Sequence, residues 1–140
     1  MPCSFDKYVG LEYAPKGRGP RYDCWGLVVL VYREMAGVEL PSFAEDYTTD
    51  DDRHELNALI ANQLTPWIEI PAGQERALDC VLMREGRCVR HIGVVVKPGM
   101  VLHVSQAKES TIERYRDSAL RRSVVGFYRY RALQGAGHPA

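Results

Sequence analysis

The segment DCWGLVVLVYREMAG, from Asp23 to Gly37, limits the possible folds of this chain more than any other feature. Residues 27–32 are apolar on every side of a helix, whereas a helix at a protein surface has a single apolar stripe. Asp23 is a favoured N-cap, because its carboxylate accepts the unpaired N–H groups of the first turn, and Gly37 is a typical C-terminal stop. We therefore expect a buried helix from about Asp23 to Ala36.

The sequence beyond Pro66 predicts short strands, which can pack against this helix. The expected strands are rich in β-branched and aromatic residues and are separated by turn residues. They are WIEI, DCVLMR, RHIGVVVK, MVLHVS and VVGFYRY, at residues 67–70, 79–84, 90–97, 100–105 and 124–130. A short helix within residues 4–13 and an amphipathic helix over 53–64 are expected before them. Helices followed by an antiparallel meander indicate the α+β class.

The length of 140 residues fits one domain. We assign residues 1–133 to it and expect residues 134–140, QGAGHPA, to be a disordered tail. The run Asp50–Asp52 resembles a metal site at first sight. Acidic residues also favour a helix N-terminus, and we prefer that interpretation because the expected helix at 53–64 follows directly.

Composition excludes several functions. The 18 basic and 18 acidic residues give no net charge, which argues against a domain that holds nucleic acid by bulk charge. No window approaches the roughly 18 apolar residues of a membrane span, so no membrane insertion is expected. The N-terminal residues lack the pattern of a secretory signal, which predicts synthesis in the cytoplasm without a signal peptide.

The cysteines are Cys3, Cys24, Cys80 and Cys88. No two of them have the two-residue separation common in zinc sites, so no metal site is expected. Cys24 would be the first residue of the buried helix, where the helix dipole favours a thiolate and lowers the thiol pKa. The alternative is an inert packing cysteine.

Two histidines lie on consecutive expected strands, and the register decides whether they can act together. If Val96 pairs with Met100, His91 and His103 become diagonal neighbours on one face. If a two-residue turn at Pro98–Gly99 closes the hairpin, they point to opposite faces unless a bulge intervenes.

A joint role is chemically sensible. A histidine that acts as a base needs its other ring nitrogen held by a partner, and His103 could hold His91 in this way. Gly93 beside the pair would leave room for another group to approach. The alternative is two core histidines satisfied by backbone groups. A cysteine at a helix start with two strand histidines downstream is the layout of a papain-like thiol hydrolase.

The motifs YDCWGLV, HIGVVV and LHVS together resemble the NlpC/p60 family of cysteine peptidases, over about residues 8–130. In that family a D-C-x-G motif starts the central helix, and H-[VI]-G followed by a second strand histidine completes the site. The resemblance implies a papain-like fold, with N-terminal helices and the nucleophile helix packed on a C-terminal antiparallel sheet. It implies Cys24 as nucleophile, His91 as general base and then acid, and His103 as the residue that orients His91. No metal or organic cofactor is implied.

Three neighbours of these residues are further candidates. Tyr22 matches a tyrosine near the oxyanion, where a phenol could stabilise the tetrahedral intermediate; packing against Trp25 is the equal alternative. Asp23 is first an N-cap and second a binder of a substrate amine. Trp25 departs from the serine of many cell-wall members. A second departure is Leu78-Asp79, where the family often has Gly-Asp.

Trp25, the short single domain and the terminal VGFYRYR resemble the variant encoded among phage tail genes. That resemblance implies hydrolysis of the D-γ-glutamyl–diaminopimelate bond of peptidoglycan stem peptides by a virion tail component, with tail-tip proteins as partners, acting at the periplasmic cell wall. Two alternatives stay open: a structural tail-tip subunit with an idle or partner-gated site, and a thiol amidase or acyltransferase.

Overall fold

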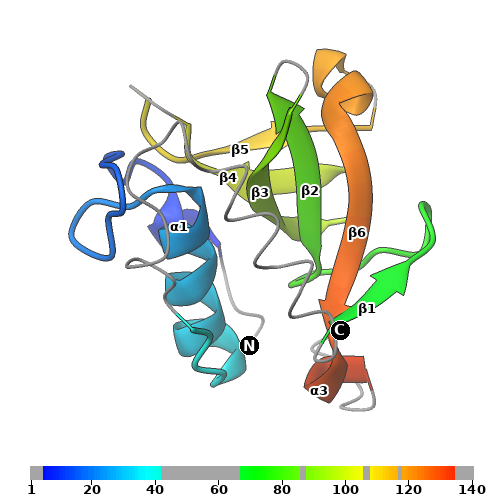
Figure 1. Ribbon diagram of the computed structural model, residues 1–140, viewed down its shortest axis with the longest axis horizontal. Coiled ribbons are helices and arrows are strands. Elements are labelled where there is room, and N and C mark those ends of the chain that lie inside the picture. The colour runs from blue at the N-terminus through cyan, green and yellow to red at the C-terminus, as the bar shows by residue number, and fades with distance from the viewer. Residues whose placement is uncertain (1–4, 42–66, 86–87, 106–107, 117, 135–140) are drawn as a thin grey trace.

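The structure, a computed structural model, describes residues 5–41, 67–85, 88–105, 108–116 and 118–134. Figure 1 shows one long helix lying beside a single sheet, which confirms the α+β class. The helices are η1 (Asp6–Tyr8), α1 (Cys24–Val31), η2 (Tyr32–Ala36), η4 (Ala119–Ser123) and α3 (Arg131–Gln134). The strands are β1 (Trp67–Ile70), β2 (Cys80–Glu85), β3 (Cys88–Lys97), β4 (Met100–His103), β5 (Thr111–Arg114) and β6 (Val124–Tyr130).

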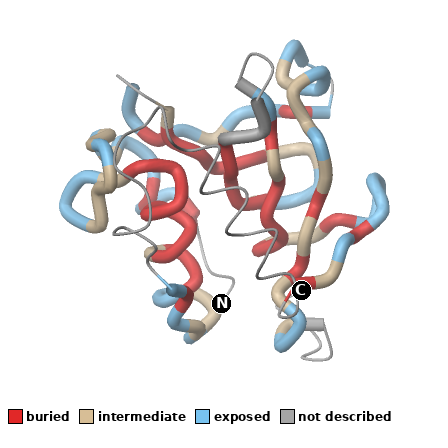
Figure 2. Tube along the Cα trace, in the orientation of Figure 1, coloured by how far each residue is buried: buried red, intermediate tan, exposed pale blue. Residues whose placement is uncertain are grey.

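The buried helix begins and ends where the sequence places it. The Asp23 side chain accepts a hydrogen bond from the Gly26 N–H at 2.7 Å, so it is the N-cap of α1. The last turn, η2, widens to π-helical geometry, and Gly37 ends it in the left-handed region with φ 66°. Figure 2 shows α1 as an almost continuously buried tube, and only Leu30 of its residues is half-buried.

The N-terminal helix is shorter than predicted. It is a single 3-10 turn, Asp6–Tyr8, because Gly10 turns the chain with φ 90°. The predicted helix at 53–64 and the run Asp50–Asp52 lie outside the described residues, as do residues 135–140 of the predicted tail. No helix within the described ranges is long and apolar enough to cross a bilayer.

The sheet is antiparallel, with the strand order β1-β6-β2-β3-β4-β5. The predicted meander is therefore wrong at one end, because β6 pairs with both β1 and β2. Both faces of β6 carry core residues: Phe127 packs in one apolar cluster, and Tyr128 and Tyr130 pack against another. A strand that is covered on both faces is better placed inside the sheet than at its edge.

The larger apolar cluster joins α1 to the sheet. It contains Trp25 and Leu27 of α1 together with Ile92 and Val94 of β3 and Leu102 of β4. Among the strands, β3 is the one against which α1 packs most closely. The helix that begins at Cys24 is therefore held on the strand that carries His91.

A buried ion pair fixes the start of β2 to β6. Arg129 donates through Nε and Nη2 to the two carboxylate oxygens of Asp79, at 2.8 and 2.9 Å. The backbone N–H of Arg76 also donates to Asp79 Oδ2, at 2.9 Å. The Asp79 and Arg129 side chains are only 2% and 8% exposed. Both charges therefore depend on each other and on the surrounding hydrogen bonds for compensation.

Leu78 has a backbone conformation that favours glycine. Its φ is 76°, a left-handed conformation that costs a non-glycine residue about 1–2 kcal/mol. Its side chain is nevertheless 4% exposed and belongs to the cluster that joins α1 to the sheet. The chain therefore keeps an unfavourable backbone conformation in exchange for a buried apolar side chain.

We expect Leu78→Gly to lower the free energy of unfolding, by about 1–3 kcal/mol. Removal of a buried leucine side chain costs about 2–5 kcal/mol, which exceeds the relief of about 1–2 kcal/mol from the left-handed backbone. Urea unfolding followed by circular dichroism measures the change. Lys16→Gly is the control, since Lys16 has φ 57° without a place in the buried core, and the same backbone relief should leave its free energy of unfolding unchanged or raise it by up to about 1–2 kcal/mol. An increase in stability for Leu78→Gly would contradict this balance.

Candidate active site

The two strand histidines are in direct contact. His91 Nε2 and His103 Nδ1 are 2.7 Å apart, and the ring centroids are 5.0 Å apart. Their residues are 4% and 5% exposed, so the contact is shielded from water. Of the two arrangements that the sequence leaves open, the structure therefore has the one in which the two histidines share a face.

A β-bulge makes this contact possible. The hairpin closes across the two-residue turn, with Lys97 opposite Met100, which by itself would send the histidines to opposite faces. The register then shifts between Val95 and Lys97, so that Val95 pairs with Val101. A bulge adds one residue to one strand and thereby exchanges the faces beyond it. The structure therefore has the two-residue turn at Pro98–Gly99 and, beyond the bulge, the register in which the two histidines share a face.

The space beside Gly93 is occupied, which corrects the expectation of an open approach there. A Cβ atom on Gly93 would lie 2.6 Å from Val101 Cγ2, 2.9 Å from the Leu102 carbonyl oxygen and 3.1 Å from His103 Cβ. Glycine is required at this position because β4 comes close, and β4 carries His103. Gly93 thus serves the histidine contact by letting two strands approach.

Cys24 is the first residue of α1 and is 1% exposed. Arg18 supports the N-cap of this helix. Its Nη1 donates to Asp23 Oδ1 at 2.9 Å and to the Gly17 carbonyl at 2.9 Å. This ion pair ties the loop that precedes Cys24 to the first turn of its helix. Cys24 thus stands at a fixed helix start, on the element that packs against β3.

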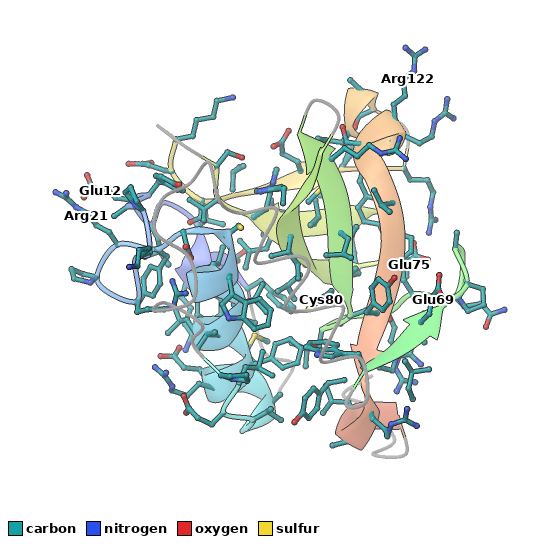
Figure 3. The ribbon with its side chains drawn as sticks, viewed as in Figure 1. Glu12, Arg21, Glu69, Glu75, Cys80 and Arg122 are labelled. Atoms are coloured by element: carbon teal, nitrogen blue, oxygen red, sulfur yellow. The ribbon has the colours of Figure 1, made fainter. Side chains whose placement is uncertain are left out.

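The other described cysteine side chain is unsuited to be a nucleophile. Cys80, on β2, is marked in Figure 3 and lies in the same apolar cluster as α1. Burial raises the pKa of its thiol to about 12, although a hydrogen bond with Tyr32 opposes that rise. Cys80 therefore stays a neutral thiol at physiological pH. Cys3 and the side chain of Cys88 lie outside the described part of the chain.

The structure adds an acidic residue that the sequence analysis missed. Glu113 Oε1 lies 2.7 Å from His103 Nε2, so the contact between the histidines continues to a third side chain. Thr111 is opposite His103 and Glu113 is opposite Val101, which makes Glu113 a diagonal neighbour of His103. The strand TIER has little apolar alternation, so it is not among the strands expected from the sequence. Only the register with β4 identifies this residue.

Tyr22 is half-buried and borders a cavity of about 150 Å³. The helix residues that line this cavity include Gly26, Val29 and Leu30. At about 100° per residue these positions lie on the side of α1 opposite Cys24. This placement favours a packing role, and the oxyanion role of Tyr22 stays a prediction.

Asp23 and Trp25 have clear structural roles. The Asp23 carboxylate is 0% exposed and accepts hydrogen bonds from the first turn of α1 and from Arg18. Trp25 is 1% exposed, and its indole N–H donates to the Pro41 carbonyl at 2.9 Å. Trp25 thus fixes the chain that leaves the helical region. Contact of either residue with substrate stays a prediction.

Within the ranges that the structure describes, no three or more His, Cys, Asp or Glu side chains form a group that could hold a metal ion. Nε2 of His91, both ring nitrogens of His103 and Oε1 of Glu113 are used in contacts among these three side chains.

Comparison with known proteins finds one family model and several solved structures that are similar to this chain. The model of the NlpC/P60 family matches residues 10–129. The structure is similar to the NlpC/p60 domain of the peptidoglycan hydrolase SagA, with a TM-score of 0.61, 18% identity, and coverage of 87% of this chain and 89% of that domain. Among curated protein sequences, none matches this chain significantly.

Two longer structures share the fold. One is an NLP/P60 family protein from Staphylococcus aureus described as similar to a lipoprotein, with a TM-score of 0.63 and 22% identity over 93% of this chain. The other is an NlpC/P60 family protein from Bacillus cereus, with a TM-score of 0.65 and 17% identity over 93% of this chain. This chain spans 44% and 41% of their lengths. The family match over most of the sequence shows that the chain belongs to the NlpC/P60 family of cysteine peptidases and hydrolases.

Proposed function

We propose that this chain is a cysteine endopeptidase that hydrolyses peptidoglycan stem peptides, with Cys24 as nucleophile, His91 as general base and His103 as the residue that orients His91. The contact of 2.7 Å between His91 and His103 carries the proposal. It is supported by the position of Cys24 at the start of the helix that packs on β3.

The contact also assigns the ring nitrogens. Because Nε2 of His91 is used by His103, Nδ1 is the nitrogen that exchanges a proton with the thiol. The Cys24 thiolate attacks the amide carbon, the C–N bond breaks, and the imidazolium of His91 gives its proton to the leaving amine. A water molecule, deprotonated by His91, then attacks the thioester and releases the acid and the thiol.

We assign the D-γ-glutamyl–diaminopimelate bond as the target. A stem peptide around this bond carries carboxylates and an amino group, so its binding surface needs positively and negatively charged side chains. A depression of about 280 Å³ is lined by Glu12, Tyr13, Arg21, Lys108 and Glu109. Figure 3 labels Glu12 and Arg21, which come from the loop before α1. This loop leads directly to Cys24, which supports its use in substrate binding.

The proposed setting is the tail tip of a phage or prophage virion, with synthesis in the bacterial cytoplasm, tail-tip proteins as partners and action at the periplasmic cell wall. Trp25 supports it as the residue that departs from the cell-wall members of the family. A second candidate is a tail-tip subunit whose site opens only with a partner, and the 1% exposure of Cys24 favours it. A thiol amidase or acyltransferase would use the same side chains.

Purified protein should release new amino groups from peptidoglycan, and mass analysis should show cleavage between D-glutamate and diaminopimelate. Cys24→Ala should abolish the release, whereas Cys80→Ala should keep it, since Cys80 is a neutral buried thiol. Equal release by the Cys24→Ala variant and the unmodified protein would refute the enzyme assignment. Activity that appears only with tail proteins present would identify the gated site.

A further inference from the structure

Three neighbouring strands each contribute one side chain to a continuous polar chain. His91 of β3 contacts His103 of β4 at 2.7 Å, and His103 contacts Glu113 of β5 at 2.7 Å. We propose that Glu113 is a positioning residue that sets the tautomers of both histidines, so that Nδ1 of His91 is left as an unprotonated base. This inference rests on the proposed function, because it assigns how the same site is prepared for catalysis.

The tautomers follow from counting protons along the chain. A carboxylate only accepts hydrogen bonds, so Nε2 of His103 must carry the proton in its contact with Glu113. Neutral imidazole has one N–H, and Nδ1 of His103 is then an acceptor. Nε2 of His91 must therefore carry the proton between the two rings, which leaves Nδ1 of His91 with a lone pair. That nitrogen is the one required to take a proton from Cys24.

Glu113 is well placed to impose this order from outside the buried pair. Its side chain is 48% exposed, whereas the side chain of His103 is 6% exposed. Exposure lets the carboxylate stay charged at little desolvation cost while its oxygen reaches the enclosed ring. When His91 takes the thiol proton and becomes an imidazolium, the negative charge of Glu113 lies at the far end of the row of polar side chains. This charge stabilises the two histidines in that state.

Without Glu113, either nitrogen of His103 can carry the proton. When Nδ1 of His103 carries the proton, Nε2 of His91 must accept it in a hydrogen bond. A neutral His91 then has its own proton on Nδ1, so Nδ1 cannot act as the base. At metal sites, loss of the outer partner that orients a ligating histidine typically costs about 10–100-fold in affinity or activity, and we take this range as the guide here. We expect Glu113→Leu to lower kcat by about this factor with KM nearly unchanged, since the proposed role of Glu113 acts through His103 and not through contact with substrate.

Two variants separate the hydrogen bond from the charge. In Glu113→Gln the amide oxygen can accept from His103, so the tautomer is kept and kcat should stay well above that of Glu113→Leu. Glu69→Leu is the control, because Glu69 lies on β1, at the opposite edge of the sheet from β5. It should change neither kcat nor KM.

The direct test is nuclear magnetic resonance of ring nitrogens in 15N-histidine-labelled protein, at a pH where both histidines are neutral. Correlations from ring protons distinguish protonated from unprotonated nitrogens. Both histidines should show a protonated Nε2 and an unprotonated Nδ1, and Glu113→Leu should show a mixture. Unchanged tautomers and unchanged kcat in Glu113→Leu would overturn the proposal. If the protein is no more active than Cys24→Ala, the proposed function fails, and the tautomer pattern still decides the role of Glu113.

Discussion

Replacement of His91 by glutamine is expected to lower kcat/KM toward soluble stem peptides by about 10²–10⁴-fold, the usual contribution of a general base. Glutamine has a similar size, and its amide can donate to His103, so the buried contact is kept in part. No group then takes the thiol proton or returns it to the leaving amine. The measurement is a steady-state assay of amine release at neutral pH.

The rate at which iodoacetamide alkylates Cys24 gives a second readout of the same variant. Only the thiolate reacts, so loss of the His91 base should slow alkylation at neutral pH more than at alkaline pH. Mass mapping of the labelled peptide excludes contributions from the other cysteines. Glu69→Gln, at the far edge of the sheet, should match the unmodified protein in both assays. Alkylation and turnover that are unaffected in His91→Gln would show that His91 does not act on Cys24.

Replacement of Arg129 by methionine is expected to lower the free energy of unfolding by about 3–5 kcal/mol, because it leaves the Asp79 carboxylate buried and uncompensated. Arg129 makes two charge-assisted hydrogen bonds to that carboxylate, at 2.8 and 2.9 Å, in a site from which solvent is almost excluded. A loss of this size is a large part of the 5–15 kcal/mol typical of a domain. Urea unfolding at pH 7 measures it.

An exposed pair provides the matched control. Arg33 Nη2 lies 2.8 Å from Glu39 Oε2, but these side chains are 51% and 67% exposed. Arg33→Met should therefore change the free energy of unfolding far less than Arg129→Met does. Asp79→Leu combined with Arg129→Met should recover much of the loss, since replacing both members of a buried pair is often neutral. Equal losses for Arg33→Met and Arg129→Met would show that burial does not determine the effect.

The start of α1 could be predicted from sequence because its signals are local. Asp23 and Gly26 are three residues apart, and the cap between them is a property of the first helical turn. Cys24 follows directly from that boundary. The sequence also limits the pairing of the two histidine strands to two registers, because the alternation of side chains along a strand needs no tertiary information.

The remaining features depend on distant parts of the chain. The bulge between Val95 and Lys97 determines which of the two registers forms, and no sequence signal at these residues predicts it. Glu113 became visible only through the pairing of β5 with β4, because its strand is polar and lies at the sheet edge. The place of β6 between β1 and β2 also reflects packing on both faces, which its own sequence does not specify.

The central place of β6 also bears on when this protein can fold during its synthesis. Residues 124–130 fill the position between β1 and β2, and β2 in turn pairs with the strand that carries His91. A nascent chain that has released α1, β2, β3 and β4 from the ribosome still lacks the strand that connects β1 to β2. The elements that carry Cys24 and the histidines are thus all made before the platform that holds them is complete. Completion of the six-stranded sheet must then follow translation of nearly the whole described chain.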